Sequence, residues 1–219
     1  MAYDTVGDLI KAFREDEKDA IAPYFWSDNQ LVRWINEALT EFAERSLSIY
    51  DEESDVTLLS YAIDEDRFEL DPSILDVTGA WVNGHRHAEL SRGPYPFGYL
   101  RGGYLQGFNG CASCFHFDGA GILRLHPKPA APGEIRLRVI RGPVRELEKC
   151  DRIQDVMAKD RRHLLSWMAY KAYRVNEGET YSIESSNAHL QRFEEACQEV
   201  MEKGIKRRGD CSRPIRSHF

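Results

Sequence analysis

The stretch SDNQLVRWINEALTEFAERSLSIY at residues 27–50 carries the clearest helical pattern in the chain. Its apolar residues recur at intervals of three and four, so they form one stripe along an α-helix. The stripe consists of Leu31, Trp34, Ile35, Ala38, Leu39, Phe42 and Ala43. Ser27 is a favourable N-cap with Gln30 as its capping-box partner, and Asp28 suits the positive end of the helix dipole. Because each buried aromatic side chain is worth roughly 1.5–3 kcal/mol, we expect this helix to pack against others.

Three further segments show helical periodicity, at residues 4–20, 152–175 and 183–200, and the last has a stripe close to a heptad repeat. The acidic residues of the first segment are expected in solvent: Asp8, Glu15, Asp16 and Asp19. No single helix can hide its stripe alone, so the helices from the two ends of the chain are predicted to share one core. Trp34 and Trp167 should lie in that core.

Three aromatic residues, Tyr24, Phe25 and Trp26, come directly before the N-cap at Ser27. Such residues can form a stacking platform for bases, or a hydrophobic staple that packs on the following helical turn. Their position beside a cap favours the staple.

Between the helical segments the patterns are typical of short strands and turns. Asn83-Gly84 favours a two-residue hairpin turn between residues 77–82 and 85–90. Gly119-Ala120-Gly121 predicts a second hairpin, between residues 114–118 and 122–126. Residues 134–140 alternate with period two, which directs a set of apolar side chains inward. That set is Ile135, Leu137 and Val139.

The predicted fold is therefore α+β, with N- and C-terminal helices forming a helical bundle around an inserted antiparallel β-domain. Residues 1–54 and 150–204 are expected to form the bundle, and residues 55–149 the insert. Residues 205–219 are expected to form an extended, basic C-terminal arm. The 42% hydrophobic content of the 219 residues suffices for such cores.

The composition indicates a globular protein of the cytosol, or of a particle assembled there. No apolar run approaches the roughly 18 residues that cross a bilayer, and the N-terminus lacks a signal-peptide pattern. The five cysteines are therefore expected to be reduced thiols. The net charge of −7 is uneven: residues 203–219 hold six basic residues and one acidic residue, so they carry +5 and the remainder carries −12.

Few residues have the pattern of a catalytic or metal-binding site. Cys111, Cys114 and His116 resemble half of a zinc site, but the second pair that a structural zinc normally needs is missing, so free thiols are favoured. His85 and His87 share a strand face and are interpreted as edge-strand surface. We expect no enzyme activity, no cofactor and no bound metal.

The glycine-rich stretch GYLRGGYLQGFNG at residues 98–110 does not match a phosphate-binding loop. It is interpreted as a hairpin or loop whose aromatic residues, Tyr99, Tyr104 and Phe108, meet another subunit. A single RGG triplet is a weak indication of RNA binding.

The order of these patterns resembles the head-to-tail adaptor proteins of tailed bacteriophages. The resemblance rests on PYFWSDNQLVRWINEALTEFAERS (23–46), Leu70-Asp71-Pro72 with Ile74 and Leu75, LRLHPKPAAPGEIRLRVIRGP (123–143), RRHLLSWMAYKAYRVNEGET (161–180) and AHLQRFEEA (188–196). It covers roughly residues 20–200. The Cys-x-x-Cys motif and the interruption at Glu177-Gly178 depart from the family pattern.

The resemblance implies a structural protein of the virion neck, present as a ring of twelve copies on the portal protein and contacting tail or tail-completion proteins. The genome would pass through the ring without specific binding, and no membrane would be involved. The arm residues expected to anchor the ring on the portal are Lys206, Arg207, Arg208, Arg213, Arg216 and Phe219. The alternative hypothesis is a regulatory protein that binds nucleic acid with the same arm.

Overall fold

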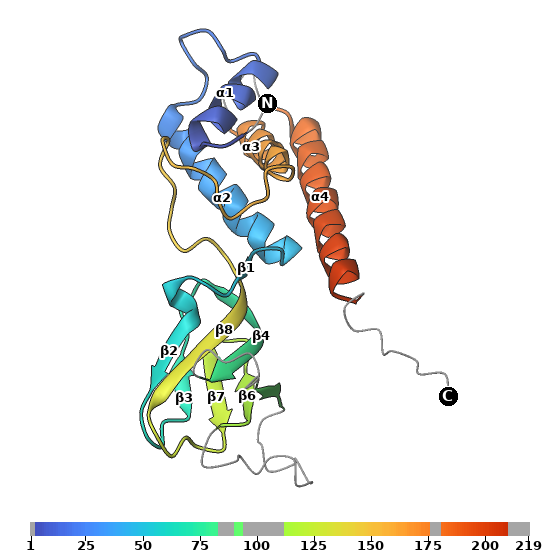
Figure 1. The fold of residues 1–219 in the computed structure, drawn as a ribbon. Coiled ribbons are helices and arrows are strands. Elements are labelled where there is room, and N and C mark those ends of the chain that lie inside the picture. Colours follow the sequence, from blue (N-terminus) through green and yellow to red (C-terminus); the bar gives the residue numbers. More distant parts are fainter. Residues whose placement is uncertain (1–2, 83–89, 94–111, 176–180, 210–219) are drawn as a thin grey trace, which may run out of the picture. The chain divides into compact units, whose positions relative to one another are not determined.

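The chain folds into two compact units, one of helices and one of strands (Figure 1). The computed structural model describes residues 3–82, 90–93, 112–175 and 181–209. The first unit comprises residues 1–49 and 143–219, and the second comprises residues 50–142. The α+β fold class predicted from the sequence is confirmed.

The first two helices of the helical unit are α1 (Val6–Asp16) and α2 (Asp28–Ser46). Ser27 caps α2 as predicted, because its side-chain oxygen accepts a hydrogen bond from the Gln30 backbone N–H at 3.3 Å. A capping box with both hydrogen bonds is present at α1, between Thr5 and Asp8. The prediction that α2 reaches Tyr50 is wrong, since Leu47 adopts a left-handed conformation at the C-cap and ends the helix.

The last two helices are α3 (Leu164–Ala172), preceded by the 3₁₀ turn η5 (Arg161–His163), and α4 (Ile183–Gly209). The predicted helix at residues 152–175 is wrong over its first half. There the backbone bonds to the N-terminus instead: Arg152 pairs with Thr5, and the Ile153 N–H donates to the Asp4 carbonyl at 2.9 Å. Ile153 and Val156 are still buried, so their spacing reflects burial without helical structure.

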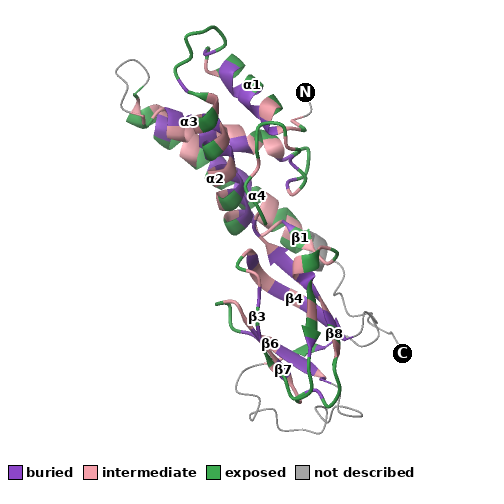
Figure 2. Cartoon of the chain, turned by 90° about the vertical axis from the view of Figure 1, so that its left-hand side faces the viewer, coloured by how far each residue is buried: buried purple, intermediate pink, exposed green. Residues whose placement is uncertain are grey.

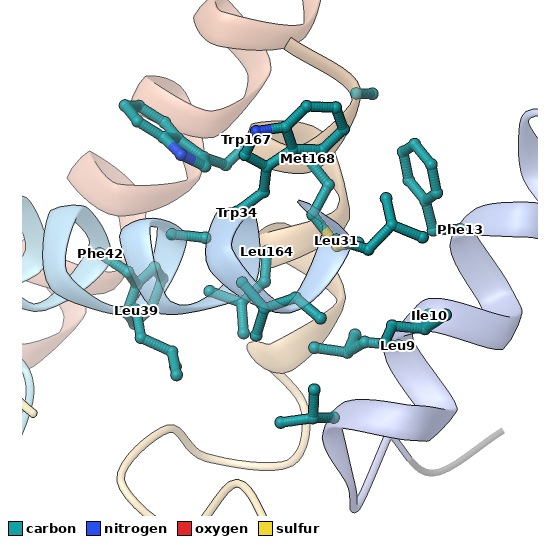
Figure 3. Packing of buried hydrophobic residues seen from close by; sticks show 14 of the residues in the cluster. Leu9, Ile10, Phe13, Leu31, Trp34, Leu39, Phe42, Leu164, Trp167 and Met168 are labelled. Atoms are coloured by element: carbon teal, nitrogen blue, oxygen red, sulfur yellow. The ribbon is translucent and has the colours of Figure 1, made fainter. Parts of the chain in front are cut away.

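The core of the helical unit is built from all four helices and from the segment before η5. Trp34 and Trp167 belong to this single core, as predicted (Figure 3). The rings of Phe42 and Phe193 lie 6.4 Å apart, and those of Trp167 and Phe193 lie 5.1 Å apart. These contacts join α2, α3 and α4, so neither end of the chain completes the core without the other.

The strand unit contains two sheets. In the first, β8 (Gly133–Arg141) pairs along one edge with β1 (Tyr50–Asp51) and β2 (Leu58–Tyr61), and along the other with β4 (Ile74–Val82). The 3₁₀ turn η1 (Asp55–Thr57) precedes β2. In the second, β3 (Arg67–Glu69), β7 (Ile122–His126), β6 (Cys114–Phe117) and β5 (Ser91–Arg92) are neighbours in that order.

The inward-facing residues of the two sheets form one hydrophobic core. Ile135, Leu137 and Val139 are completely buried, as their alternation predicts, and Figure 2 shows buried positions on the strands in purple. The hairpin at residues 114–126 is also confirmed, with Gly119 and Gly121 at positive φ. The sheet is not wholly antiparallel, because β5 pairs with β6 in parallel. The predicted turn at Asn83-Gly84 lies outside the described residues.

Candidate interaction surfaces

The basic end of α4 is the part of the predicted docking arm that the structure describes. The helix runs on to Gly209, so residues 205–209 are helical and not extended as expected. Lys206 is exposed, and its Nζ lies 4.0 Å from a carboxylate oxygen of Glu202. Arg207 and Arg208 belong to the same helix. The remaining predicted arm residues lie outside the described residues: Arg213, Arg216 and Phe219.

The burial pattern of α4 explains why this end is free to make contacts. Phe193 and Cys197 are buried, Val200 packs at the edge of the core, and the following residues are largely exposed. The predicted heptad stripe therefore serves the core only along the first two thirds of the helix. Two lysine–glutamate ion pairs at i, i+4 spacing stabilise the exposed last turns. They join Lys203 to Glu199 and Lys206 to Glu202.

The predicted inter-subunit residues Tyr99, Tyr104 and Phe108 lie outside the described residues, as do His85, His87 and Cys111. Cys114 is buried, and burial raises the pKa of its thiol. Its Sγ lies 3.5 Å from the His126 carbonyl, and the His116 ring Nδ1 lies 2.9 Å from the Gly93 carbonyl. Within the described ranges, no three His, Cys, Asp or Glu side chains group as a metal site.

The loop between α1 and α2 exposes five consecutive apolar residues, of which Tyr24 and Phe25 were predicted to pack as a staple. We call it the 21–25 loop, and it consists of Ile21, Ala22, Pro23, Tyr24 and Phe25. Ile21 is 85% exposed, Tyr24 50% and Phe25 47%. Trp26 is buried, with its ring edge-to-face on Phe13 at 5.4 Å between centroids. Trp26 is therefore buried against the preceding helix α1, whereas the staple was predicted to pack on the following turn, at the start of α2.

A buried ion pair fixes the base of this loop. Arg14 and Asp19 pair through their side chains, of which 8% and 1% are exposed. Asp19 also accepts a hydrogen bond from the Phe25 N–H at 2.7 Å, and the Arg14 Nη2 donates to the Trp26 carbonyl at 2.8 Å. The prediction that Asp19 is solvated is wrong, because the turn after α1 folds its carboxylate back onto Arg14.

Asp28 connects the Arg14–Asp19 ion pair to Lys149, which lies in the segment that follows the strand unit. Its carboxylate accepts hydrogen bonds from Lys149 and, at 2.8 Å, from the Arg14 Nη2. The bond from Lys149, together with that from Arg14, holds the pKa of Asp28 below its usual value. The Arg14 guanidinium also lies over the ring of Tyr24, 3.8 Å from its centroid.

A groove of about 1130 Å³ runs along α2 in the helical unit. We call it the α2 groove, and its walls are α2 and the 143–148 segment, with Trp167 and Lys171 from α3. Asn36 holds the two walls together: its Nδ2 donates to the Leu147 carbonyl at 2.9 Å, and its Oδ1 accepts from the Leu147 N–H at 2.8 Å. The apolar lining consists of Val32, Pro143, Val144, Leu147 and Trp167.

Comparison with known families agrees with the architecture. A family model described as SU10 adaptor protein matches residues 4–217, which include both compact units. A comparison with curated proteins finds no match. None of the helices that the structure describes is long and apolar enough to span a bilayer. Because the match extends over nearly the whole sequence, the chain belongs to the SU10 adaptor protein family of bacteriophage head-to-tail adaptors.

Proposed function

We propose that the chain forms a ring, of twelve copies as the family resemblance implies, that docks on the portal protein and connects the filled capsid to the tail. The ring lines part of the path of the genome and offers contacts to tail or tail-completion proteins. Assembly takes place in the host cytoplasm. No catalytic step is assigned to the protein.

The observation that supports portal docking most strongly is the basic end of α4. The helix extends beyond its buried stripe and presents Lys206 in solvent. Arg207 and Arg208 follow in the sequence, and residues 203–219 carry a charge of +5. Guanidinium groups form bidentate hydrogen bonds with carboxylates, so this end suits an acidic protein surface. Several such ends in one ring bind with avidity even when each contact is weak.

The acidic remainder of the chain supports the role in the conduit. Outside residues 203–219 the chain carries a charge of −12. Like charges repel, so a lumen lined by this part of the protein would not hold the phosphate backbone tightly. Weak binding is what a passage for the genome requires.

The alternative function, nucleic-acid binding through the same basic end, predicts a distinct salt response. Five net charges on duplex DNA give a slope of log K against log salt of roughly −4 to −5. In the described part of α4, both Lys203 and Lys206 already face glutamates one turn earlier. These pairs reduce the charge available to carboxylates and to phosphates alike, so the salt dependence of binding is the measurement that distinguishes the two partners.

The test is portal binding by a variant that lacks residues 210–219 and carries Lys206→Glu, Arg207→Glu and Arg208→Glu. The affinity for purified portal should fall by about tenfold or more, with an unchanged circular dichroism spectrum. The matched control reverses three exposed basic residues elsewhere, Lys11, Arg67 and Lys128, and should bind as the wild type does. Equal portal binding by the two variants contradicts the docking role of α4.

A further inference from the structure

We propose that the 21–25 loop of one copy docks into the α2 groove of the next copy, and that this contact joins neighbours around the ring. The inference rests on the ring proposed above and adds the two surfaces that would build it. It is carried by the exposed apolar residues and the unpaired charges of the loop and the groove.

The loop has the properties of an interaction surface and not of a loosely held connection. Contiguous exposed apolar residues on a soluble protein mark contact sites. The backbone behind Ile21 and Tyr24 is held by the buried Arg14–Asp19 pair and by the buried Trp26 ring. A loop fixed in this way loses little conformational entropy on binding.

The α2 groove offers the matching apolar surface. Val144 is 50% exposed at its edge, while Val32 and Leu147 are half-buried along its walls. The five apolar residues of the groove lie among ten polar or charged ones, and protein–protein contacts combine apolar and polar groups in this way. The loop does not fill the groove of its own chain, because Ile21 is almost fully exposed.

Free charges beside the two surfaces complement one another. Two cations of the groove are already paired, Lys171 with Glu37 at 2.7 Å and Arg145 with Asp151 at 2.8 Å. Arg33, on the α2 wall, is exposed and has no ion pair among the described residues.

On the opposite wall, Glu146 is exposed and its carboxylate has no cation partner within the described part of the chain. Asp16 and Lys18 precede the loop, are exposed, and likewise have no ion pair with any described residue. Docking would bring Asp16 to Arg33 and Lys18 to Glu146, which orients the loop between the two walls.

Such a contact is heterologous, because each copy offers its loop to one neighbour and its groove to the other. Heterologous contacts generate a closed ring when the rotation between copies closes, whereas isologous contacts stop at a dimer. The pair of surfaces therefore provides what a ring needs.

The test uses two full-length variants measured by sedimentation equilibrium. The loop variant carries Ile21→Asp and Phe25→Asp, and the groove variant carries Arg33→Glu and Val144→Asp. Alone, each should self-associate at least about tenfold more weakly than the wild type. Mixed, they should form a 1:1 heterodimer and nothing larger, because one intact loop and one intact groove remain.

Two control variants distinguish loss of the proposed contact from loss of the folded structure. Met157→Asp alters another exposed apolar residue of the helical unit and should self-associate as the wild type does. The charge swap Asp16→Arg with Arg33→Asp should associate better than either single change. Circular dichroism of each variant should match that of the wild type.

The inference is overturned if the wild type stays monomeric, if either variant associates normally, or if the mixed variants form no heterodimer. Portal binding distinguishes this failure from failure of the proposed function, since both variants keep the basic end of α4 intact. A loop variant that loses portal binding but self-associates normally would assign the loop to the portal and also overturn the inference.

Discussion

The helical unit and the strand unit are built from the chain in different ways. The helical unit is assembled from residues 1–49 and 143–219, whereas the strand unit is one continuous stretch, residues 50–142. Phe42 and Phe193, which meet in the helical core, are far apart in the chain. In the strand unit, β6 and β7 pair across a short turn. One hairpin of the strand unit is therefore local, whereas its other strand pairings, like the contacts of the helical core, join residues far apart in the chain.

The two units also differ in their buried charges. The helical unit buries the Arg14–Asp19 pair almost completely, and this pair holds the 21–25 loop. The strand unit buries the Arg141–Asp51 pair, with Nε to Oδ2 at 2.6 Å and side chains 12% and 9% exposed. In that unit Ser54 shares the carboxylate, donating its hydroxyl to Asp51 at 2.6 Å. The two pairs should therefore respond differently when one partner is removed.

The largest effect is expected from Arg14→Met, which should lower the free energy of unfolding of the helical unit by about 3–5 kcal/mol, because Asp19 is left charged and buried. Arg141→Met should cost less, since Asp51 keeps its hydrogen bonds from Ser54. Urea denaturation followed by circular dichroism measures both. A larger loss from Arg141→Met would reverse the comparison.

The next largest effect is expected from the matched core truncations Leu39→Ala and Leu137→Ala. Both side chains are essentially buried, so each change should cost about 2–5 kcal/mol through lost transfer energy and a cavity. Hydrogen exchange should show faster opening of α2 and its partners for the first and of β8 and its partners for the second. If either truncation loosened both units equally, the division into two cores would be wrong.

Acid should destabilise the strand unit more than the helical unit. Burial raises the pKa of Asp51, but hydrogen bonds from Ser54 and the ion pair with Arg141 outweigh it and lower the pKa well below the usual 3.8. A depressed folded-state pKa gives stability that is complete above the unfolded value and is lost as the pH falls below about 4. The pKa of Asp28 in the helical unit is also lowered, so its contribution has the same sign. Thermal unfolding between pH 5 and pH 2 measures this loss, and Asp51→Asn should flatten it.

The smallest effects are expected from a helix cap and a turn glycine. Ser27→Ala should cost about 1 kcal/mol, since the Gln30 N–H at the start of α2 loses its acceptor. Gly121→Ala should also cost about 1 kcal/mol, because φ is +96° there. Chemical denaturation resolves losses of this size. No change for Gly121→Ala would mean that the β6–β7 turn relaxes away from its positive φ.

The sequence predicted those elements in which the burial of side chains repeats with the period of the helix or strand. Two patterns predicted which side chains enter the cores: the alternation of Ile135, Leu137 and Val139, and the apolar stripe of α2. The segment after Arg152 was mispredicted because its backbone pairs with residues near Thr5, a partner that periodicity cannot reveal. The extent of α4 was underestimated, since its last turns are held by surface charge pairs and not by apolar spacing.

The candidate surfaces were predictable only in part. The basic residues after Lys203 were evident from composition, but Tyr24 and Phe25 were interpreted, together with Trp26, as a buried staple. Its exposure depends on the burial of Arg14 and Asp19, two charged residues that a sequence reading assigns to the surface by default. The contiguous apolar run IAPYFW was the signal available in the sequence.

The most direct test of the proposed role is electron cryomicroscopy of intact particles, with the two units fitted separately into the density. The proposal predicts a ring of copies at the junction between capsid and tail, with the end of α4 near Lys206 against the portal. The proposal would be contradicted if density for this protein were found elsewhere in the particle and not at this junction. It would also be contradicted by a neck ring in which the end of α4 points away from the portal.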